Sequence, residues 1–262
     1  MQLIVDGNGV YAYSASRRFD PALPAVLFVH GAGLDHSVWA LQSRYFAHHG
    51  WNALALDLPG HGRSGGQALT SISSIADWTM RVMDAAGIAR AALVGHSMGS
   101  LATLDAAGRH PERATRLALL APSVPMPVSE ALLAAARAND HAAYELITEW
   151  SFAPAHQTGG NRQPGVWMTG NALRLMERLR PGVLHVDLSA CNDYRDGLAA
   201  ARGVRCPVLV VLGDRDRMAP ARNARELIAA LADKRVVTMA DTGHSLMVES
   251  PDAALDALRE FL

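Results

Sequence analysis

Six short apolar runs, each ending in glycine or a polar residue, constrain the fold more than any other feature of the sequence. The runs are AVLFVHGAG, NALALDLPG, AALVGHSMG, RLALLAPS, CPVLVVLGD and RVVTMAD. Continuous apolar runs of this length are typical of strands buried on both faces. Helical patterns lie between them, at about 37–49, 74–86, 98–110, 219–232 and 252–262. This alternation predicts an α/β fold with a mostly parallel, doubly wound sheet.

Two further features complete the predicted organisation. QLIVDGNGVYAYSA surrounds an Asp-Gly-Asn-Gly turn signal and predicts a β-hairpin. Between residues 124 and 205 the alternation stops, and SEALLAAARANDHAAYELITEW and TGNALRLMERLR have helical patterns. We therefore predict a core built from residues 1–123 and 206–262, with residues 124–205 inserted between two core strands as a helical cap.

The composition excludes several classes of function. The chain has 262 residues and a formal net charge of -1, so it has no basic excess for nucleic acid or an anionic membrane surface. No signal-peptide pattern or run of about 18 apolar residues is present, so we expect a cytoplasmic protein with a small-molecule substrate and no membrane partner. Cys191 and Cys206 lack disulfide or metal spacing, so we expect reduced, partly buried thiols and no metal site.

The carboxyl ends of the predicted strands hold the candidate chemistry, because ligands bind at that edge of a parallel sheet. Ser97, Asp216 and His244 each follow one of these strands. A serine hydroxyl becomes nucleophilic when an imidazole accepts its proton, and a carboxylate orients and stabilises that imidazole. GHSMG, residues 95–99, also fits the Gly-x-Ser-x-Gly nucleophile elbow, since it follows a strand and opens a helix.

With these motifs in place, the sequence resembles the α/β-hydrolase family over nearly its whole length. VHGAG resembles the family's oxyanion segment, DLPGHGRS its Asp-x-Pro-Gly-x-Gly-x-Ser loop, and GHSMGS its elbow. GDRDRMAP resembles the acid loop and DTGHSLMVESP the histidine loop, in the family order of serine, acid and histidine. The resemblance implies a serine hydrolase without metal or organic cofactor. It also implies that the backbone N–H groups of Ala32 and Met98 hold the oxyanion, with Gly33 as the alternative to Ala32.

Two other aspartates compete for the role of the acid. Asp214 lies two residues before Asp216, and Asp241 lies close to His244. The family spacing of glycine, acid and proline selects Asp216, and the family uses the last loop for its histidine alone. His30 and His96 are expected to be structural histidines of the strand-end loops.

The loop DLPGHGRS is interpreted as structural. We expect Asp57, His61, Arg63 and Ser64 to make hydrogen bonds that fix it, around a turn formed by the Pro-Gly pair.

The substrate is predicted from the neutral charge and the apolar predicted cap. Trp150, Phe152, Trp167 and Met168 are candidate pocket residues, although packing between helices would produce the same pattern. We expect a carboxylesterase-like enzyme that cleaves a small to medium, largely uncharged carboxylic ester, lactone or thioester through an acyl-enzyme.

Three alternatives stay open at this point. The first is a carbon–carbon bond hydrolase acting on meta-cleavage products, for which Arg162, Arg174 and Arg178 offer a cap arginine. The second is a cofactor-free haloperoxidase or perhydrolase, because the same triad supports perhydrolysis. The third is a ligand-binding receptor on a hydrolase fold, because a fold does not determine function.

Overall fold

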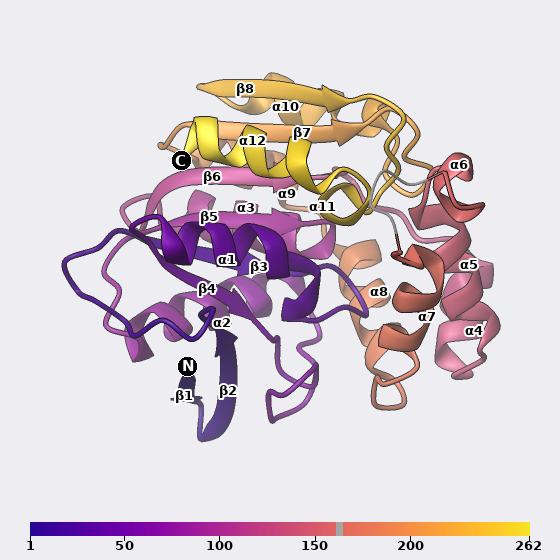
Figure 1. The fold of residues 1–262 in the computed structure, drawn as a ribbon, viewed down its shortest axis with the longest axis horizontal. Helices are drawn as coiled ribbons and strands as arrows, with labels where there is room; N and C mark the ends of the chain where they lie inside the picture. Colours follow the sequence, from indigo (N-terminus) through magenta and orange to yellow (C-terminus); the bar gives the residue numbers. More distant parts are fainter. Residues whose placement is uncertain (161–164) are drawn as a thin grey trace.

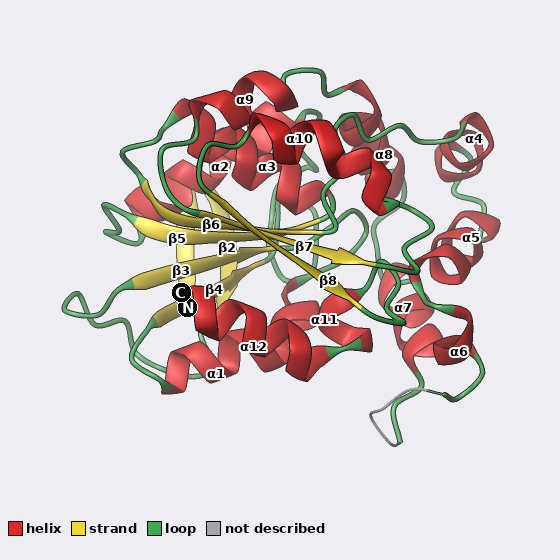
Figure 2. Cartoon of the chain, turned by 90° about the horizontal axis from the view of Figure 1, so that it is seen from above, coloured by secondary structure: helices red, strands yellow, loops and turns green. Residues whose placement is uncertain are grey.

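The computed structural model describes residues 1–160 and 165–262 and contains one eight-stranded sheet with helices on both faces (Figures 1 and 2). The strands are β1 (Gln2–Val5), β2 (Asn8–Tyr13), β3 (Ala25–Val29), β4 (Asn52–Leu56), β5 (Ala91–His96), β6 (Ala114–Leu120), β7 (Val208–Gly213) and β8 (Lys234–Met239). Their order is β1-β2-β4-β3-β5-β6-β7-β8. The strands from β3 to β8 pair in parallel, while β2 is antiparallel to β1 and β4. The predicted α/β fold is confirmed.

The β1–β2 hairpin turns at Asp6 and Gly7, which have φ angles of 50° and 75°. Positive φ at both central residues is what a type I′ turn requires, and Asp-Gly supplies it readily. The turn places Val5 opposite Asn8, so the hairpin is tighter than the four-residue signal in the sequence indicated.

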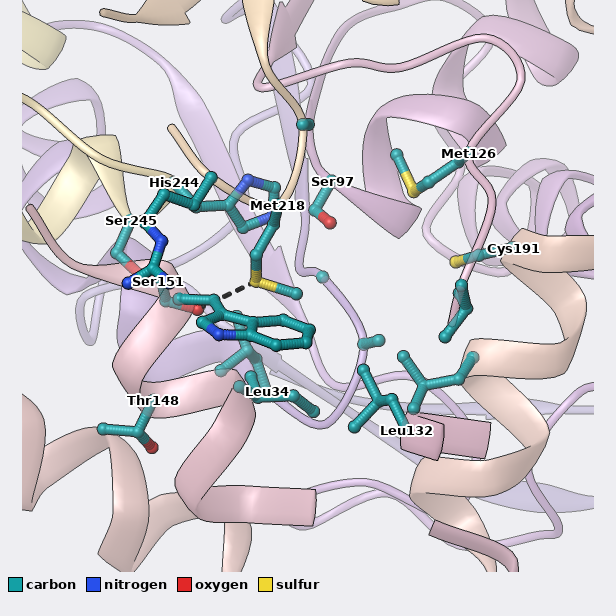
Figure 3. Close-up of a pocket in the computed structure, with 18 of the residues that line it drawn as sticks. Leu34, Ser97, Met126, Leu132, Thr148, Ser151, Cys191, Met218, His244 and Ser245 are labelled. Carbon is teal, nitrogen blue, oxygen red and sulfur yellow. Dashed lines mark hydrogen bonds between the residues drawn. The ribbon is translucent and has the colours of Figure 1, made fainter. Parts of the chain in front are cut away.

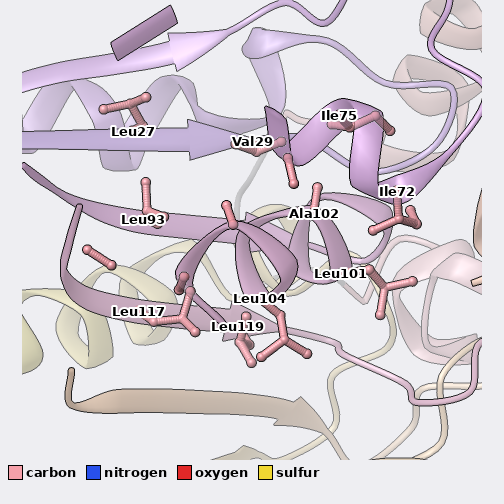
Figure 4. Close-up of a cluster of buried hydrophobic side chains, with 14 of the residues drawn as sticks. Leu27, Val29, Ile72, Ile75, Leu93, Leu101, Ala102, Leu104, Leu117 and Leu119 are labelled. Atoms are coloured by element: carbon pink, nitrogen blue, oxygen red, sulfur yellow. The ribbon is translucent and has the colours of Figure 1, made fainter. Parts of the chain in front are cut away.

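Alternate residues of each central strand face different helical layers. Leu27 and Val29 of β3 belong to the apolar cluster on one face, and Val26 and Phe28 belong to the cluster on the other. Figure 4 shows Leu27 and its neighbours on the side of α3 (Met98–Arg109). Full burial of a side chain of this size contributes about 1.5–3 kcal/mol, so these strands are held from both faces.

The first layer contains α2 (Ile72–Ala85), α3, α9 (Gly197–Gly203) and α10 (Arg225–Ala230), and the second contains α1 (Ala40–His48), α11 (Leu246–Glu249) and α12 (Pro251–Phe261) (Figure 2). Helix α2 begins earlier than predicted because Ser71 and Ser74 form a capping box. The predicted helices at 37–49 and 219–232 each open with a 3₁₀ turn, η1 (His36–Trp39) and η2 (Ala221–Ala224).

Strand β8 departs from the expectation of a strand buried on both faces. Its residues from Lys234 to Thr238 are exposed or half-buried, and Met239 alone in this strand is buried. The reason is its position, because β8 is the edge strand and pairs with β7 alone. Its apolar pattern resembles that of the central strands, but the sequence does not encode its place in the sheet.

Six helices separate β6 from β7 in the described part of the chain. Five of them lie beyond the carboxyl ends of the strands and are called the cap helices here (Figure 1): α4 (Glu130–Arg137), α5 (Ala142–Ser151), α6 (Pro154–Gln157), α7 (Met168–Met176) and α8 (Val183–Asp193). Four of them, α4, α5, α7 and α8, share a small apolar core that includes Leu132, Ile147 and Leu188.

The sixth helix, α9, packs against α3 and lies in the helical layer over the sheet. A Cβ atom at Gly108 of α3 would lie 2.4 Å from the Ala200 carbonyl oxygen, so the two helices approach at backbone distance. The end of the predicted insertion at residue 205 therefore includes a helix that covers the sheet. No helix among the described residues is both long and apolar enough to cross a membrane.

Candidate active site

Ser97 lies in a strained turn between β5 and α3. Its φ and ψ angles are 52° and -118°, a conformation that costs a non-glycine residue about 1–3 kcal/mol. A Cβ atom at Gly95 would lie 2.2 Å from the Gly99 carbonyl oxygen, and one at Gly99 would lie 2.3 Å from the Val29 carbonyl oxygen. Both glycines are therefore required by close backbone contacts.

His244 and Asp216 form a buried pair at the carboxyl ends of β8 and β7. The distance from His244 Nδ1 to Asp216 Oδ2 is 2.8 Å. The other carboxylate oxygen accepts hydrogen bonds from the N–H groups of Met218 and Ala219, at 2.9 and 2.8 Å. Burial acts to raise the pKa of Asp216, but the His244 ring and the two N–H donors outweigh it and hold that pKa below its ordinary value. The carboxylate therefore stays charged, and His244 carries a proton on Nδ1.

The two rival aspartates have other partners. Asp214 accepts a hydrogen bond from the Thr242 N–H group at 3.2 Å. The exposed Asp241 side chain pairs with Arg215 at 3.4 Å. The structure thus brings Asp216, and neither rival, to the His244 ring.

Ser97 and His244 line one cavity of about 240 Å³ beneath the cap helices (Figure 3). The Ser151 hydroxyl lies at its edge and donates a hydrogen bond to Met218 Sδ at 3.1 Å. Most other lining side chains are apolar, among them Met126, Leu132, Ile147, Trp150, Met176, Leu188 and Cys191. The cavity therefore offers an apolar environment next to the serine hydroxyl.

The 30–34 loop contributes Gly31, Ala32 and Leu34 to the lining of the cavity. Within the described residues, the backbone N–H groups of Ala32 and Met98 donate no hydrogen bond. The Gly33 N–H group, in contrast, donates to Asp187 Oδ2 at 2.9 Å. The amides of Ala32 and Met98 thus remain available as donors near Ser97, whereas the Gly33 amide is already hydrogen-bonded.

His30 is buried and neutral. Its Nδ1 atom donates to the Gly31 carbonyl oxygen at 2.8 Å, and its Nε2 atom accepts from the Leu58 N–H group at 3.2 Å. Burial and the nearby His61 ring lower the pKa of His30 to about 4.

His96 is also buried and neutral, and its Nε2 atom donates to the His244 carbonyl oxygen at 2.9 Å. Burial and the His244 ring lower the pKa of His96 to about 3. Both histidines hold loops in place and exchange no proton near neutral pH.

The loop DLPGHGRS is fixed by hydrogen bonds through its aspartate. Asp57 accepts from the backbone N–H groups of His36 and Arg63, both at 2.8 Å, and from the His36 ring at 2.7 Å. The Ser64 hydroxyl donates to the Asp57 carbonyl oxygen at 2.7 Å. Asp35, His36 and Asp57 are close enough to hold a cation, but these N–H donors, with the Ser37 N–H group on Asp35, already occupy carboxylate oxygens.

The four predicted pocket residues lie in different places. Trp150 lines the cavity with Ser97, while Phe152 and Met168 line a neighbouring cavity. The Trp167 residue is 68% exposed and lines neither. An apolar residue at helical spacing has the same pattern whether it packs, lines a pocket or reaches the surface, so the sequence could not separate these cases.

Of the three arginines considered for the cap, the two that the structure describes do not line the cavity with Ser97. Arg174 and Arg178 lie at the neighbouring cavity, and Arg162 falls outside the described residues. Among the described residues, Arg217 is the arginine that lines the Ser97 cavity, and its guanidinium pairs with Glu149 at 3.3 Å.

Sequence reasoning missed two buried carboxylates between the cap helices and the core. Asp187 of α8 accepts from Gly33 and from His61 Nε2, which lies at 2.8 Å. Glu249 of α11 accepts from the Ala153 N–H group at 2.8 Å and from His156 Nδ1 at 2.7 Å. The signal in the sequence was a single acid within an apolar helical segment, as in VLHVDLSA, because a buried acid needs a partner.

Comparison with known proteins agrees with this geometry. A family model described as the alpha/beta hydrolase fold matches residues 24–251, and the chain therefore belongs to the α/β-hydrolase family. It is 30% identical to the pimeloyl-[acyl-carrier protein] methyl ester esterase of Aromatoleum aromaticum, over 87% of this chain and 94% of that relative.

Two further similarities point to the same family of hydrolases. The chain is 35% identical, over 37% of its length and 36% of the relative, to the (E)-2-((N-methylformamido)methylene)succinate hydrolase of Acinetobacter baylyi. The crystal structure of the enol-lactonase from Burkholderia xenovorans LB400 matches with a TM-score of 0.86 at 25% identity, covering 100% of this chain and 99% of that one. The protein is thus a hydrolase with esterase-like relatives.

Proposed function

We propose that this protein is a serine hydrolase that cleaves small to medium, largely uncharged carboxylic esters, including lactones and thioesters, through an acyl-enzyme. One observation carries the proposal. Ser97, strained at the start of α3, and His244, which is hydrogen-bonded to Asp216, line the same apolar cavity. A nucleophile, a base and an orienting acid are the groups that acyl transfer needs.

In this mechanism Asp216 fixes the tautomer of His244. With the proton held on Nδ1, the Nε2 atom has the lone pair and accepts the proton of Ser97 as the hydroxyl oxygen attacks the acyl carbonyl carbon. The resulting imidazolium is stabilised by the Asp216 carboxylate, whose lowered pKa keeps it charged.

The negative charge on the carbonyl oxygen is held by the free N–H groups of Ala32 and Met98. The start of α3 at Met98 adds the positive end of a helix dipole. When the tetrahedral intermediate collapses, the bond to the leaving group breaks and His244 donates its proton to that group. Water then attacks the acyl-enzyme by the same steps, and the acid is released.

The cavity supports the substrate class. Its volume of about 240 Å³ is below the ~300–1,000 Å³ of pockets for drug-sized ligands, and its lining is mostly apolar. Arg217 is paired with Glu149 and leaves no unbalanced charge there. The names of the methyl ester esterase and the enol-lactonase support esters and lactones as the bonds to test.

The test compares hydrolysis of p-nitrophenyl acetate and butyrate by the wild type and by Ser97→Ala. The wild type should turn over, and Ser97→Ala should lose on the order of 10³–10⁶-fold in kcat, as in other serine hydrolases. Ser43→Ala is the matched control, because that buried hydroxyl lies in α1 and has no hydrogen-bond partner in the described part of the chain.

Equal rates for wild type and Ser97→Ala would refute the assignment of the nucleophile. A folded wild type without turnover on a broad panel of esters and lactones would instead favour a ligand-binding receptor. Turnover of a ring-fission dienone in place of the esters would favour carbon–carbon bond hydrolysis.

A further inference from the structure

We infer that Asp187, a residue of the cap helix α8, is a positioning residue for the 30–34 loop, which it holds so that the Ala32 amide is presented to the reacting oxygen. The inference rests on the proposed function, because it concerns the oxyanion donors of that mechanism. Asp187 itself does not line the cavity with Ser97, so it acts through the loop and not on the substrate.

Three segments that are distant in the sequence meet at one oxygen atom of Asp187. Its Oδ2 atom accepts from the Gly33 N–H group at 2.9 Å and from His61 Nε2 at 2.8 Å. The carboxylate and the His61 ring are both almost fully buried, with exposed side-chain fractions of 2% and 1%. A buried acid with two donors on one oxygen is therefore the point that joins α8 to two loops of the core.

The partner of this carboxylate is a protonated histidine. His61 Nδ1 lies 3.0 Å from the Pro59 carbonyl oxygen, which can only accept, and Nε2 lies against the Asp187 carboxylate. Both ring nitrogens therefore donate, which requires the imidazolium form. The other titratable groups facing the ring are Asp57 and the neutral His30. Burial acts to lower the pKa of His61, but Asp187 raises it above its ordinary value.

The 30–34 loop needs such an anchor because of its glycine. Gly33 has a φ of 68°, a conformation that glycine adopts freely but leaves freely as well. The Gly33–Asp187 hydrogen bond removes that freedom. A Cβ atom added at Gly33 would lie 3.1 Å from the Leu184 side chain and 3.3 Å from that of Leu179, so α8 and the residues before it lie close over this glycine. The Gly33 amide is turned to Asp187, whereas the Ala32 amide is left free at the cavity.

The same contact links the cap helices to catalysis. Ala32 packs against the apolar core of the cap helices, and α8 supplies the acceptor for the next residue. The oxyanion donor is thus held from the cap side as well as from the sheet. The Ala32 amide is therefore correctly placed only when α8 is packed on the core.

The kinetic test uses Asp187→Ala, Asp187→Asn and a matched control, Tyr194→Phe. The Tyr194 hydroxyl, just after α8, donates to Asp105 Oδ1 at 2.8 Å, a buried contact with the core away from the 30–34 loop. For p-nitrophenyl butyrate, Asp187→Ala should lower kcat by about 10–100-fold, less than the ~10²–10³-fold seen when an oxyanion donor is removed. KM should change by less than about 3-fold, because a transition-state interaction is affected.

The kcat of Asp187→Asn should lie between those of the wild type and Asp187→Ala, because an amide oxygen accepts a weaker hydrogen bond than a charged carboxylate does. Tyr194→Phe should lose stability but keep kcat within about 2-fold of the wild type, as expected for a contact outside the site. A folded Asp187→Ala variant with the kcat of Tyr194→Phe would overturn the inference.

A second readout does not depend on activity. Hydrogen exchange at the Gly33 amide, followed by NMR, should accelerate in the order wild type, Asp187→Asn, Asp187→Ala, and Tyr194→Phe should match the wild type. If Asp187→Ala fails to fold, Asp187→Asn against the wild type decides the point. Unchanged exchange at Gly33 would refute the anchor even in an active enzyme. Accelerated exchange in a protein without esterase turnover would support the anchor while the proposed function fails.

Discussion

Replacing Gly99 by alanine tests how tightly the turn around Ser97 is packed. A Cβ atom there would lie 2.3 Å from the Val29 carbonyl oxygen and 2.6 Å from that of His30. Ordinary contacts lie at about 3.5 Å, so the backbones must separate by about 1 Å. Val29 belongs to β3, which pairs with β4 on one side and β5 on the other, so the Val29 backbone cannot move away from Gly99. The elbow has to move instead.

The expected cost has two parts. Overpacking in a well-packed core lowers the free energy of unfolding by about 1–3 kcal/mol. Displacing a reacting group by about 1 Å costs on the order of 100-fold in rate, so kcat for p-nitrophenyl butyrate should fall by about that factor. Urea denaturation measures the first quantity, and initial rates at saturating ester measure the second.

The matched control is Gly9→Ala, because a Cβ atom at Gly9 has no neighbour within 4 Å and its φ is not positive. This variant should stay within about 0.5 kcal/mol of the wild type and keep its kcat. If Gly99→Ala behaved like the control, the claim that backbone contacts dictate a glycine at this position would be wrong.

Two further predictions concern charged groups. Asp216→Asn should lower kcat by on the order of 10⁴-fold, because it removes the charge that orients His244. Asp214→Asn should have a small effect on kcat. If Asp214→Asn lowered kcat more than Asp216→Asn, Asp214 would be the catalytic acid. The raised pKa of His61 means that its pairing with Asp187 stabilises the fold fully below about pH 6.5 and is lost as the pH rises through the folded-state value. The difference in free energy of unfolding between wild type and Asp187→Asn should therefore be larger at pH 6 than at pH 9, and a constant difference would contradict a protonated His61.

The central sheet and the order of the candidate catalytic residues along the chain could be predicted because local sequence patterns indicate both. Strands such as β5 read as uninterrupted apolar runs, since both faces are covered, and the residue that follows each run must lie at the carboxyl edge. That rule alone places Ser97, Asp216 and His244 at one edge of the sheet. Their pairing is then a matter of loop geometry, which the structure shows for His244 and Asp216.

The cap side of the site could not be predicted in the same way. Phe152 and Trp167 are both large apolar residues in helical surroundings, yet one is buried beside a second cavity and the other is mostly exposed. Asp187 and His61 are separated by 126 positions in the chain. Nothing local in either segment indicates that these two residues meet, because their contact depends on how α8 lies over the core.

The buried acid–histidine pairs at the border of the cap helices also restrict how this protein can diversify. Exchanging the cap helices for those of another hydrolase would leave His61 without Asp187, and Glu249 without His156. Removing one partner of a buried pair costs about 3–5 kcal/mol, a large share of the ~5–15 kcal/mol that stabilises a typical domain. New specificities should therefore arise in this lineage by changes in cavity-lining residues such as Leu132 and Met176, while the anchoring acids and histidines are inherited as matched sets.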